Sequence, residues 1–222
     1  LNQRMTEYFA RYGWDESKIK SHDRSKSKKR SKGAAFVPVN QPKAPASPAV
    51  KPNVVIIFID DMGYGDIGPF GSDHPTPHLD RMAREGMKLT DFYVSSTACT
   101  PSRSALLTGC YADRIGMGKS VVFPADNRGL NPKEITIAEI LKQAGYATGC
   151  FGKWHLGDQP RFMPLAQGFD EYEGIPYSND MWVRGNPKRK YPPLPWIKGN
   201  QAVAHIPDPE NQALITDAIT DA

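Results

Sequence analysis

Residues 53–61 read NVVIIFIDD, and this stretch decides the fold class. Residues 54–59 are all apolar and mostly β-branched, which is typical of a strand buried on both faces of a parallel sheet. Asp60 and Asp61 follow directly. Ligands of open α/β sheets bind beyond the carboxyl ends of the strands. We therefore expect a buried strand that delivers two carboxylates to a site.

Helices and strands alternate after this stretch. Capping residues and apolar spacing predict helices between Thr76 and Gly86 and between Thr136 and Gly145. Strands are predicted at Met87–Val94 and Tyr146–Phe151. This alternation predicts an α/β fold with a mostly parallel central sheet flanked by helices.

The carboxyl-terminal third shows weaker patterns. Residues 181–209 are rich in Pro, Lys and Trp with little periodicity, and we expect a surface excursion near the mouth of the site. Residues 211–222 resemble the start of a helix.

Residues 96–109, STACTPSRSALLTG, predict a short helix with a reactive start. Thr100 is expected as its N-cap, residues 105–107 as its buried part and Gly109 as its terminator. Cys99 would then lie just before the helix N-terminus, where free N–H groups favour negative charge. Arg103, one turn in, can reach back over the same position. The alternatives for Cys99 are a small buried apolar residue and a reactive thiolate.

Residues 152–157, GKWHLG, follow the predicted strand 146–151. On an extended segment, Lys153 and His155 leave the same side of the chain. A point cation beside an imidazole suits oxyanion binding and proton transfer. Without the flanking glycines, a surface lysine and an ordinary hydrogen-bonded histidine would be preferred.

Adjacent carboxylates repel each other, so burying both Asp60 and Asp61 requires a cation. Carboxylate oxygens suit a hard ion, which makes Ca²⁺ the first expectation and Mg²⁺ the second. The alternative is that Asp61 begins a turn with Gly63.

Charge is unevenly distributed over the 222 residues, whose net charge is +4. Residues 1–51 carry a balance of +8 and residues 52–222 a balance of −4. We expect residues 1–50 to be a basic, Pro-rich, disordered arm or linker, and the folded domain to span 51–222. Such an arm could bind a polyanion, although a solvated linker is the preferred interpretation. The longest apolar run, residues 54–59, is far too short to span a membrane.

Several motifs together resemble the type I sulfatases, arylsulfatase A-like branch. They occur in the family's order and cover about residues 51–222: DDMGYGD (60–66), TPHLD (76–80), CTPSR followed by ALLTG (99–109), GKWHLG (152–157), GFD (168–170) and GIPYSND (174–180). The resemblance implies an alkaline-phosphatase-like α/β fold, truncated at the carboxyl-terminal side, and hydrolysis of organic sulfate esters.

Specific roles also follow from the resemblance. Cys99 would be oxidised to Cα-formylglycine by a formylglycine-generating enzyme, and the hydrated aldehyde would attack sulfur and contact Ca²⁺. Asp60 and Asp61 would hold the metal, and Arg103 would steady the hydrate. Lys153 would bind a sulfate oxygen, and His155 would assist deprotonation. The family's later metal ligands and its leaving-group histidine have no counterpart here, so residues 51–222 resemble the amino-terminal part of a catalytic domain that would be inactive alone.

Alternatives from other classes remain. One is a phosphoesterase or phosphonate hydrolase of the same superfamily, and another is an inactive domain behind a polyanion-binding arm. The expected partners are a sulfated small molecule or glycan and the modifying enzyme, and nucleic acid is not expected. The sequence does not determine the compartment, although the resemblance implies a secreted or periplasmic protein.

Overall fold

The structure, a computed structural model, describes residues 51–183, 185, 188–206 and 208–222. The described residues fall into two compact units, 51–91 and 92–222, which we treat separately. The prediction of a disordered arm at residues 1–50 lies outside the described residues.

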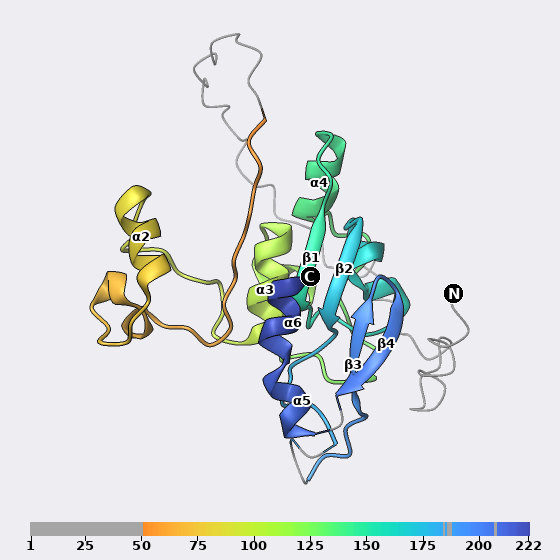
Figure 1. Ribbon diagram of the computed structural model, residues 1–222. Coiled ribbons are helices and arrows are strands. Elements are labelled where there is room, and N and C mark those ends of the chain that lie inside the picture. Colours follow the sequence, from red (N-terminus) through yellow and green to blue (C-terminus); the bar gives the residue numbers. More distant parts are fainter. Residues whose placement is uncertain (1–50, 184, 186–187, 207) are drawn as a thin grey trace. The chain divides into compact units, whose positions relative to one another are not determined.

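A four-stranded sheet organises the unit of residues 92–222 (Figure 1). Its strands lie in the order β1 (Gly149–Lys153), β2 (Glu171–Ile175), β3 (Leu194–Lys198) and β4 (Gln201–Ile206). Strands β1 and β2 are parallel, whereas β2 with β3 and β3 with β4 are antiparallel. The α/β class is confirmed, and among the described strands the sheet is mixed rather than mostly parallel.

The antiparallel pairs come from the stretch that we expected to be a surface excursion. Within residues 181–209, strands β3 and β4 form a hairpin whose turn contains Gly199, at a φ of 59°. Prolines at 192, 193 and 195 argue against a strand in a sequence reading. The expectation of an excursion is therefore wrong for residues 194–206, because pairing with the edge of β2 overrides the local signal.

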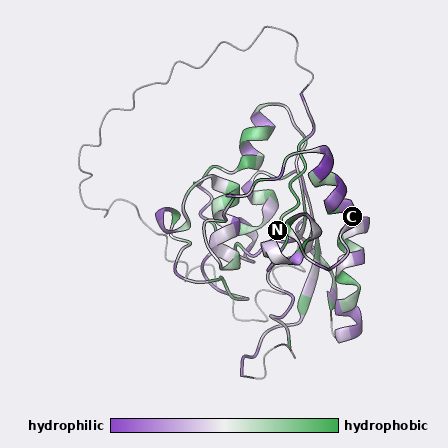
Figure 2. Cartoon of the chain, turned by 90° about the vertical axis from the view of Figure 1, so that its left-hand side faces the viewer, coloured by the Kyte–Doolittle hydropathy of each residue, from purple (hydrophilic) through white to green (hydrophobic). Residues whose placement is uncertain are grey.

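Four α-helices belong to the described residues of this unit. Their bounds are α3 (Cys99–Thr108), α4 (Ile137–Gln143), α5 (Pro209–Ala213) and α6 (Ile215–Asp221), with short 3₁₀ turns at Ala112–Ile115, Pro160–Phe162 and Pro164–Gln167. Helix α4 starts with the predicted cap, since Thr136 and Glu139 form a capping box. A Cβ added at Gly152 would lie 3.5 Å from Ile219 Cδ1, so α6 packs on β1. The helices carry both hydrophilic and hydrophobic residues (Figure 2).

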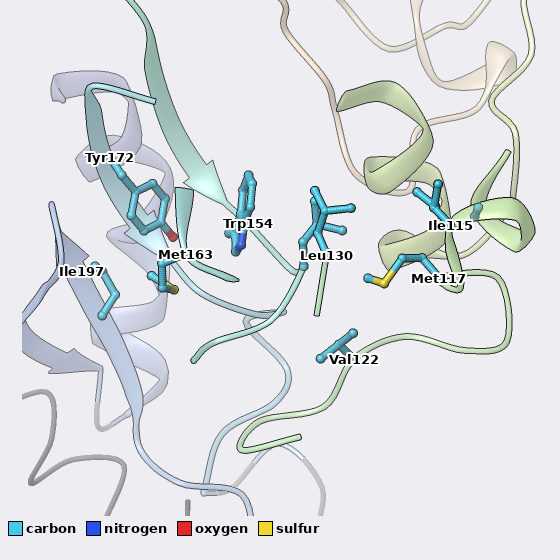
Figure 3. Close-up of a cluster of buried hydrophobic side chains, with 10 residues drawn as sticks. Ile115, Met117, Val122, Leu130, Trp154, Met163, Tyr172 and Ile197 are labelled. Carbon is cyan, nitrogen blue, oxygen red and sulfur yellow. The ribbon is translucent and has the colours of Figure 1, made fainter. Parts of the chain in front are cut away.

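Two clusters of buried side chains hold the unit together. The first joins strand residues Tyr172 and Ile197 to loop residues such as Leu130 and Val122 (Figure 3). Trp154 lies within it, and its Nε1 donates to the Phe162 carbonyl at 2.8 Å. The second cluster comprises Ile175, Tyr177, Met181, Trp182, Leu194 and Ile206. The segment after β2 is thereby packed against the β3–β4 hairpin.

The unit of residues 51–91 contains α2 (Pro77–Glu85) and 3₁₀ turns at Tyr64–Asp66 and Gly68–Phe70. Helix α2 has its N-cap at Thr76 and its C-cap at Gly86, as predicted. The predicted strands are absent from the described residues here: 53–59 and 87–94 adopt no strand, and Val55 is 82% and Tyr93 73% exposed. A strand needs a neighbouring strand that accepts its backbone hydrogen bonds, and among the described strands none is paired with these segments.

In the part of the chain that the structure describes, every helix is too short or too polar to cross a bilayer.

Candidate functional site

Helix α3 places Cys99 in its first turn. The helix begins at Cys99 after Ala98, whose extended backbone serves as N-cap, so Thr100 is not the cap that we expected. The first intrahelical bond runs from the Ser102 N–H to the Ala98 carbonyl at 3.0 Å. The earlier N–H groups have no acceptor within the helix and favour negative charge beside Cys99. Gly109, at a φ of 63°, terminates the helix as predicted.

Thr100 does not cap because its hydroxyl is used elsewhere. Thr100 is fully buried, and its Oγ1 donates to the His155 carbonyl at 2.8 Å. The same oxygen accepts the Val122 N–H at 3.0 Å. One hydroxyl thus connects α3, the segment after β1 and the loop around residue 122. Polar residues of the first turn are accordingly buried, whereas Ala105, Leu106 and Leu107 are only half-buried, contrary to expectation.

Lys153, the last residue of β1, lies at the centre of the site. Its Nζ donates to Cys99 Sγ at 3.3 Å and to Ser178 Oγ at 3.2 Å. Because β1 and β2 are parallel, with Lys153 opposite Ile175, both strands end at the same edge. Ser178 follows β2 by three residues and meets Lys153 there. The carboxyl ends of parallel strands therefore bring together a nucleophilic position, a cation and a hydroxyl.

Arg103 is directed towards the end of the same strand. Its guanidinium donates to the Lys153 carbonyl at 2.6 Å. Burial raises the pKa of the Cys150 thiol to about 12, partly offset by the positive charge of Arg103. Burial likewise raises the pKa of Tyr172 well above its usual range, again opposed by Arg103. This charge therefore lies over β1 and β2, close to the backbone that carries Lys153.

His155 lies behind this edge, and its surroundings differ from those expected. The strand ends at Lys153, and His155 has a φ of 58°, so strand alternation does not extend to its side chain. Its ring is buried, and Nε2 lies 2.9 Å from the Val122 carbonyl oxygen. A carbonyl can only accept, so Nε2 carries the proton of this bond and Nδ1 is the basic nitrogen of the neutral ring.

A buried acid, Asp158, stabilises the loop that follows residue 122. Asp158 is 4% exposed, and its Oδ2 accepts the N–H of Ala125 at 2.7 Å. Burial raises the pKa of this carboxyl to about 7, an effect that the Ala125 N–H partly opposes. Ala125 has a φ of 60°, so the bond holds a non-glycine residue in the left-handed region.

Asp60 and Asp61 belong to the unit of residues 51–91, and both are exposed. Asp61 has a φ of 54°. Calcium takes six to eight oxygen ligands, more than two carboxylates provide. Among the residues that the structure describes, no group of three His, Cys, Asp or Glu side chains is placed to hold a metal ion. The donors described do not complete a calcium site, and the two aspartates remain predicted ligands.

Two residues of the site, Ser178 and Thr100, were not among the predicted site residues. Ser178 contacts the amine of Lys153, and Thr100 connects three segments. Ser178 lies just after the end of a strand, and this position is the signal that could have selected it. That this strand, β2, runs parallel to β1 is known only from the structure. Thr100 carried only a capping signal, since its true partners lie 22 and 55 residues away.

Comparisons with known proteins identify the family. The sequence model described as Sulfatase matches residues 52–219. The chain is 52% identical to human arylsulfatase A over 134 residues, which is 58% of this chain and 26% of that protein. It is 47% identical to rat arylsulfatase G over 148 residues, 66% of this chain and 28% of the relative. The chain thus spans about a quarter of the length of these relatives.

Solved structures give the same result. The crystal structure of Ps i-CgsB superposes with a TM-score of 0.59 at 32% identity, covering 72% of this chain and 37% of that one. PsFucS1 sulfatase from Pseudoalteromonas sp. superposes with a TM-score of 0.59 at 28% identity, covering 73% and 38%. With a family match over more than half of its residues, the chain belongs to the sulfatase family.

Proposed function

We propose that the protein hydrolyses organic sulfate esters, with Cα-formylglycine made from Cys99 as the source of the nucleophilic oxygen. The observation that carries this proposal is the placement of Lys153 Nζ, 3.3 Å from Cys99 Sγ and 3.2 Å from Ser178 Oγ. The family supports it, because its relatives here include arylsulfatases A and G and a mouse steryl-sulfatase. In the net reaction, water cleaves the ester to an alcohol and hydrogen sulfate.

The chain's own residues supply positive charge where a sulfate would bind. Lys153 would bind a sulfate oxygen, and the N–H groups at the start of α3 would orient towards the same anion. Arg103, whose guanidinium donates to the Lys153 carbonyl, would add a fixed positive charge beside the end of β1. The Nδ1 atom of His155 would accept a proton, since Nε2 already donates to the Val122 carbonyl. A hydrated aldehyde at position 99 would supply an oxygen nucleophile that a thiol lacks.

Maturation of Cys99 before folding fits the burial of its neighbours. Pro101 is buried in the folded chain and Arg103 is half-buried. An enzyme that recognises Cys99, Pro101 and Arg103 together would find all three fully accessible only in the unfolded chain. We therefore propose a formylglycine-generating enzyme as a partner during synthesis.

We propose Ca²⁺ as the metal, with Asp60 and Asp61 as two of its ligands. A divalent ion would act as a Lewis acid on a sulfate oxygen. Carboxylates are the ligands that such a hard ion prefers, which supports the assignment.

The experiment combines mass spectrometry of the peptide around Cys99 with hydrolysis of p-nitrophenyl sulfate by the full-length protein. We expect the aldehyde at position 99, turnover of the sulfate, and loss of turnover in Cys99→Ala. The matched control is Cys110→Ala, another half-buried free cysteine, which should keep its activity. An unmodified thiol in all molecules would contradict the proposed nucleophile. Faster turnover of bis-p-nitrophenyl phosphate than of the sulfate would favour the phosphoesterase alternative.

A further inference from the structure

The segment of residues 181–198, which contributes Met181, Trp182 and Leu194 to the second buried cluster, is strongly basic. Residues 181–198 contain five Lys and Arg and no Asp or Glu. Three of these cations, Lys188, Arg189 and Lys190, are consecutive and exposed. Consecutive positive charges repel one another, and an anion bound beside them relieves this repulsion. The position of these three cations relative to the candidate site therefore matters.

Arg189 is held on an aromatic platform. Its guanidinium carbon lies 4.1 Å from the centroid of the Phe123 ring. Phe123 in turn stacks with Tyr191, at 6.5 Å between centroids and 16° between planes. Cation–π contact restrains a guanidinium while the N–H donors at its edge can still bind an anion. This side chain is therefore partly preorganised, unlike an ordinary surface arginine.

The charges of Arg189 and Lys190 are not neutralised within the described chain. Neither forms an ion pair with a carboxylate among residues 51–183, 185, 188–206 and 208–222. Arg128 differs, because it pairs with Asp126 at 3.1 Å. Arg189 and Lys190 are thus available to an external anion.

The platform is attached to the candidate site at two points. Phe123 directly follows Val122, whose N–H donates to Thr100 Oγ1 and whose carbonyl accepts from His155 Nε2. Tyr177, which precedes Ser178, donates its hydroxyl to the Pro193 carbonyl at 3.4 Å, two residues beyond Tyr191. Consecutive Cα atoms are about 3.8 Å apart, so these links keep the platform near the site.

We propose that Arg189, on the platform of Phe123 and Tyr191, and the adjacent Lys190 bind a second anionic group of an extended substrate. The substrate class is then a sulfated oligosaccharide that carries several sulfate groups. One sulfate would lie at Lys153 and another at Arg189. This inference rests on the proposed sulfate ester hydrolysis. A small aryl ester has a single sulfate and would leave the platform unused.

The test compares Arg189→Gln with Lys133→Gln, an exposed lysine in another loop, in the full-length protein. Binding of a heparin-derived hexasaccharide is measured by calorimetry at fixed low salt, and p-nitrophenyl sulfate hydrolysis is measured in parallel. We expect Arg189→Gln to weaken hexasaccharide binding about fivefold, the upper range for an exposed ion pair. Hydrolysis of p-nitrophenyl sulfate should change less than about twofold, which is within the effect of a remote surface substitution. Lys133→Gln should change neither.

The basic residues 1–50 are present in every variant and contribute equally to hexasaccharide binding. The difference in binding between variants therefore measures the contribution of the platform. Unchanged hexasaccharide binding in Arg189→Gln would overturn the inference while the proposed function stood. Equal weakening for a single-stranded DNA oligomer of the same charge would also overturn it, because the platform would then bind any polyanion. If the wild type hydrolyses no sulfate ester, the proposed function fails, and a selective loss of hexasaccharide binding would still support the platform.

Discussion

Replacing Asp158 by Asn should change how the stability of the protein depends on pH. The carboxyl is buried, and Oδ2 accepts the Ala125 N–H. Among the described residues, Oδ1 has no hydrogen-bond partner. Ionising this group in the folded state therefore places a charge in a site that provides little compensation, which is why burial raises its pKa from 3.8 to about 7.

The sign and size follow from proton linkage. Between pH 4 and pH 7 the folded state holds a proton that the unfolded state has released, so stability falls as pH rises through this window. The decrease begins near the unfolded pKa and is complete above about 7. A shift of about three pKa units corresponds to roughly 4 kcal/mol. Asparagine does not titrate, so Asp158→Asn should lack this decrease.

The assay is urea unfolding of wild type and variant at pH 5, 6, 7 and 8. We expect the stability of the variant minus that of the wild type to rise by about 3 kcal/mol between pH 5 and pH 8. The buried Nδ2 group of asparagine costs free energy at every pH, so the slope is the readout and not the absolute difference. The matched control is Asp180→Asn, at an exposed carboxylate. Parallel curves for wild type and Asp158→Asn would refute the reasoning.

Two further predictions concern the cap of α4 and the thiol of Cys150. Thr136→Ala should destabilise the protein by about 2 kcal/mol in thermal or urea unfolding, because Oγ1 accepts the Glu139 N–H and donates to the Gln167 carbonyl. Thr220→Ala, which removes an exposed hydroxyl of α6, should cost less than about 0.5 kcal/mol, and similar losses at both positions would contradict a specific role for the cap. Cys150 should resist iodoacetamide at pH 8 in the native protein and react once unfolded, because burial raises its thiol pKa to about 12. Rapid native alkylation of the peptide that contains Cys150, read by mass spectrometry, would show that the thiol is accessible.

Local signals predicted the ends of helices well. The cap at Thr136 and the terminator Gly109 lie where the sequence indicated, because each acts on backbone groups within a few residues. Thr76 also precedes its helix as predicted, although its hydroxyl forms no capping bond and instead accepts the Gly68 N–H. Strands were predicted less well. Residues 54–59 have the composition of a buried strand and adopt none, whereas proline-rich residues 194–198 form β3. Strand formation depends on a partner that the sequence does not specify.

For the candidate site, too, some residues were predicted from local motifs and others depended on the tertiary structure. Cys99, Arg103 and Lys153 were selected from motifs, and the structure places them at the end of β1 with their contacts. Expecting Lys153 and His155 on one side of an extended segment was wrong, since the positive φ of His155 ends the strand geometry. Ser178 received a role only once β1 and β2 were known to be parallel neighbours.

By itself, the sequence determined the family, several of the helix ends and the types of residue available for chemistry, since these depend on residue identity and short-range backbone geometry. Only the tertiary structure decided that Thr100 would connect three segments, that the ring of His155 would face a carbonyl, and that Arg189 would lie on Phe123. Such contacts join residues far apart in the chain, and their free energy arises only when packing brings the segments together.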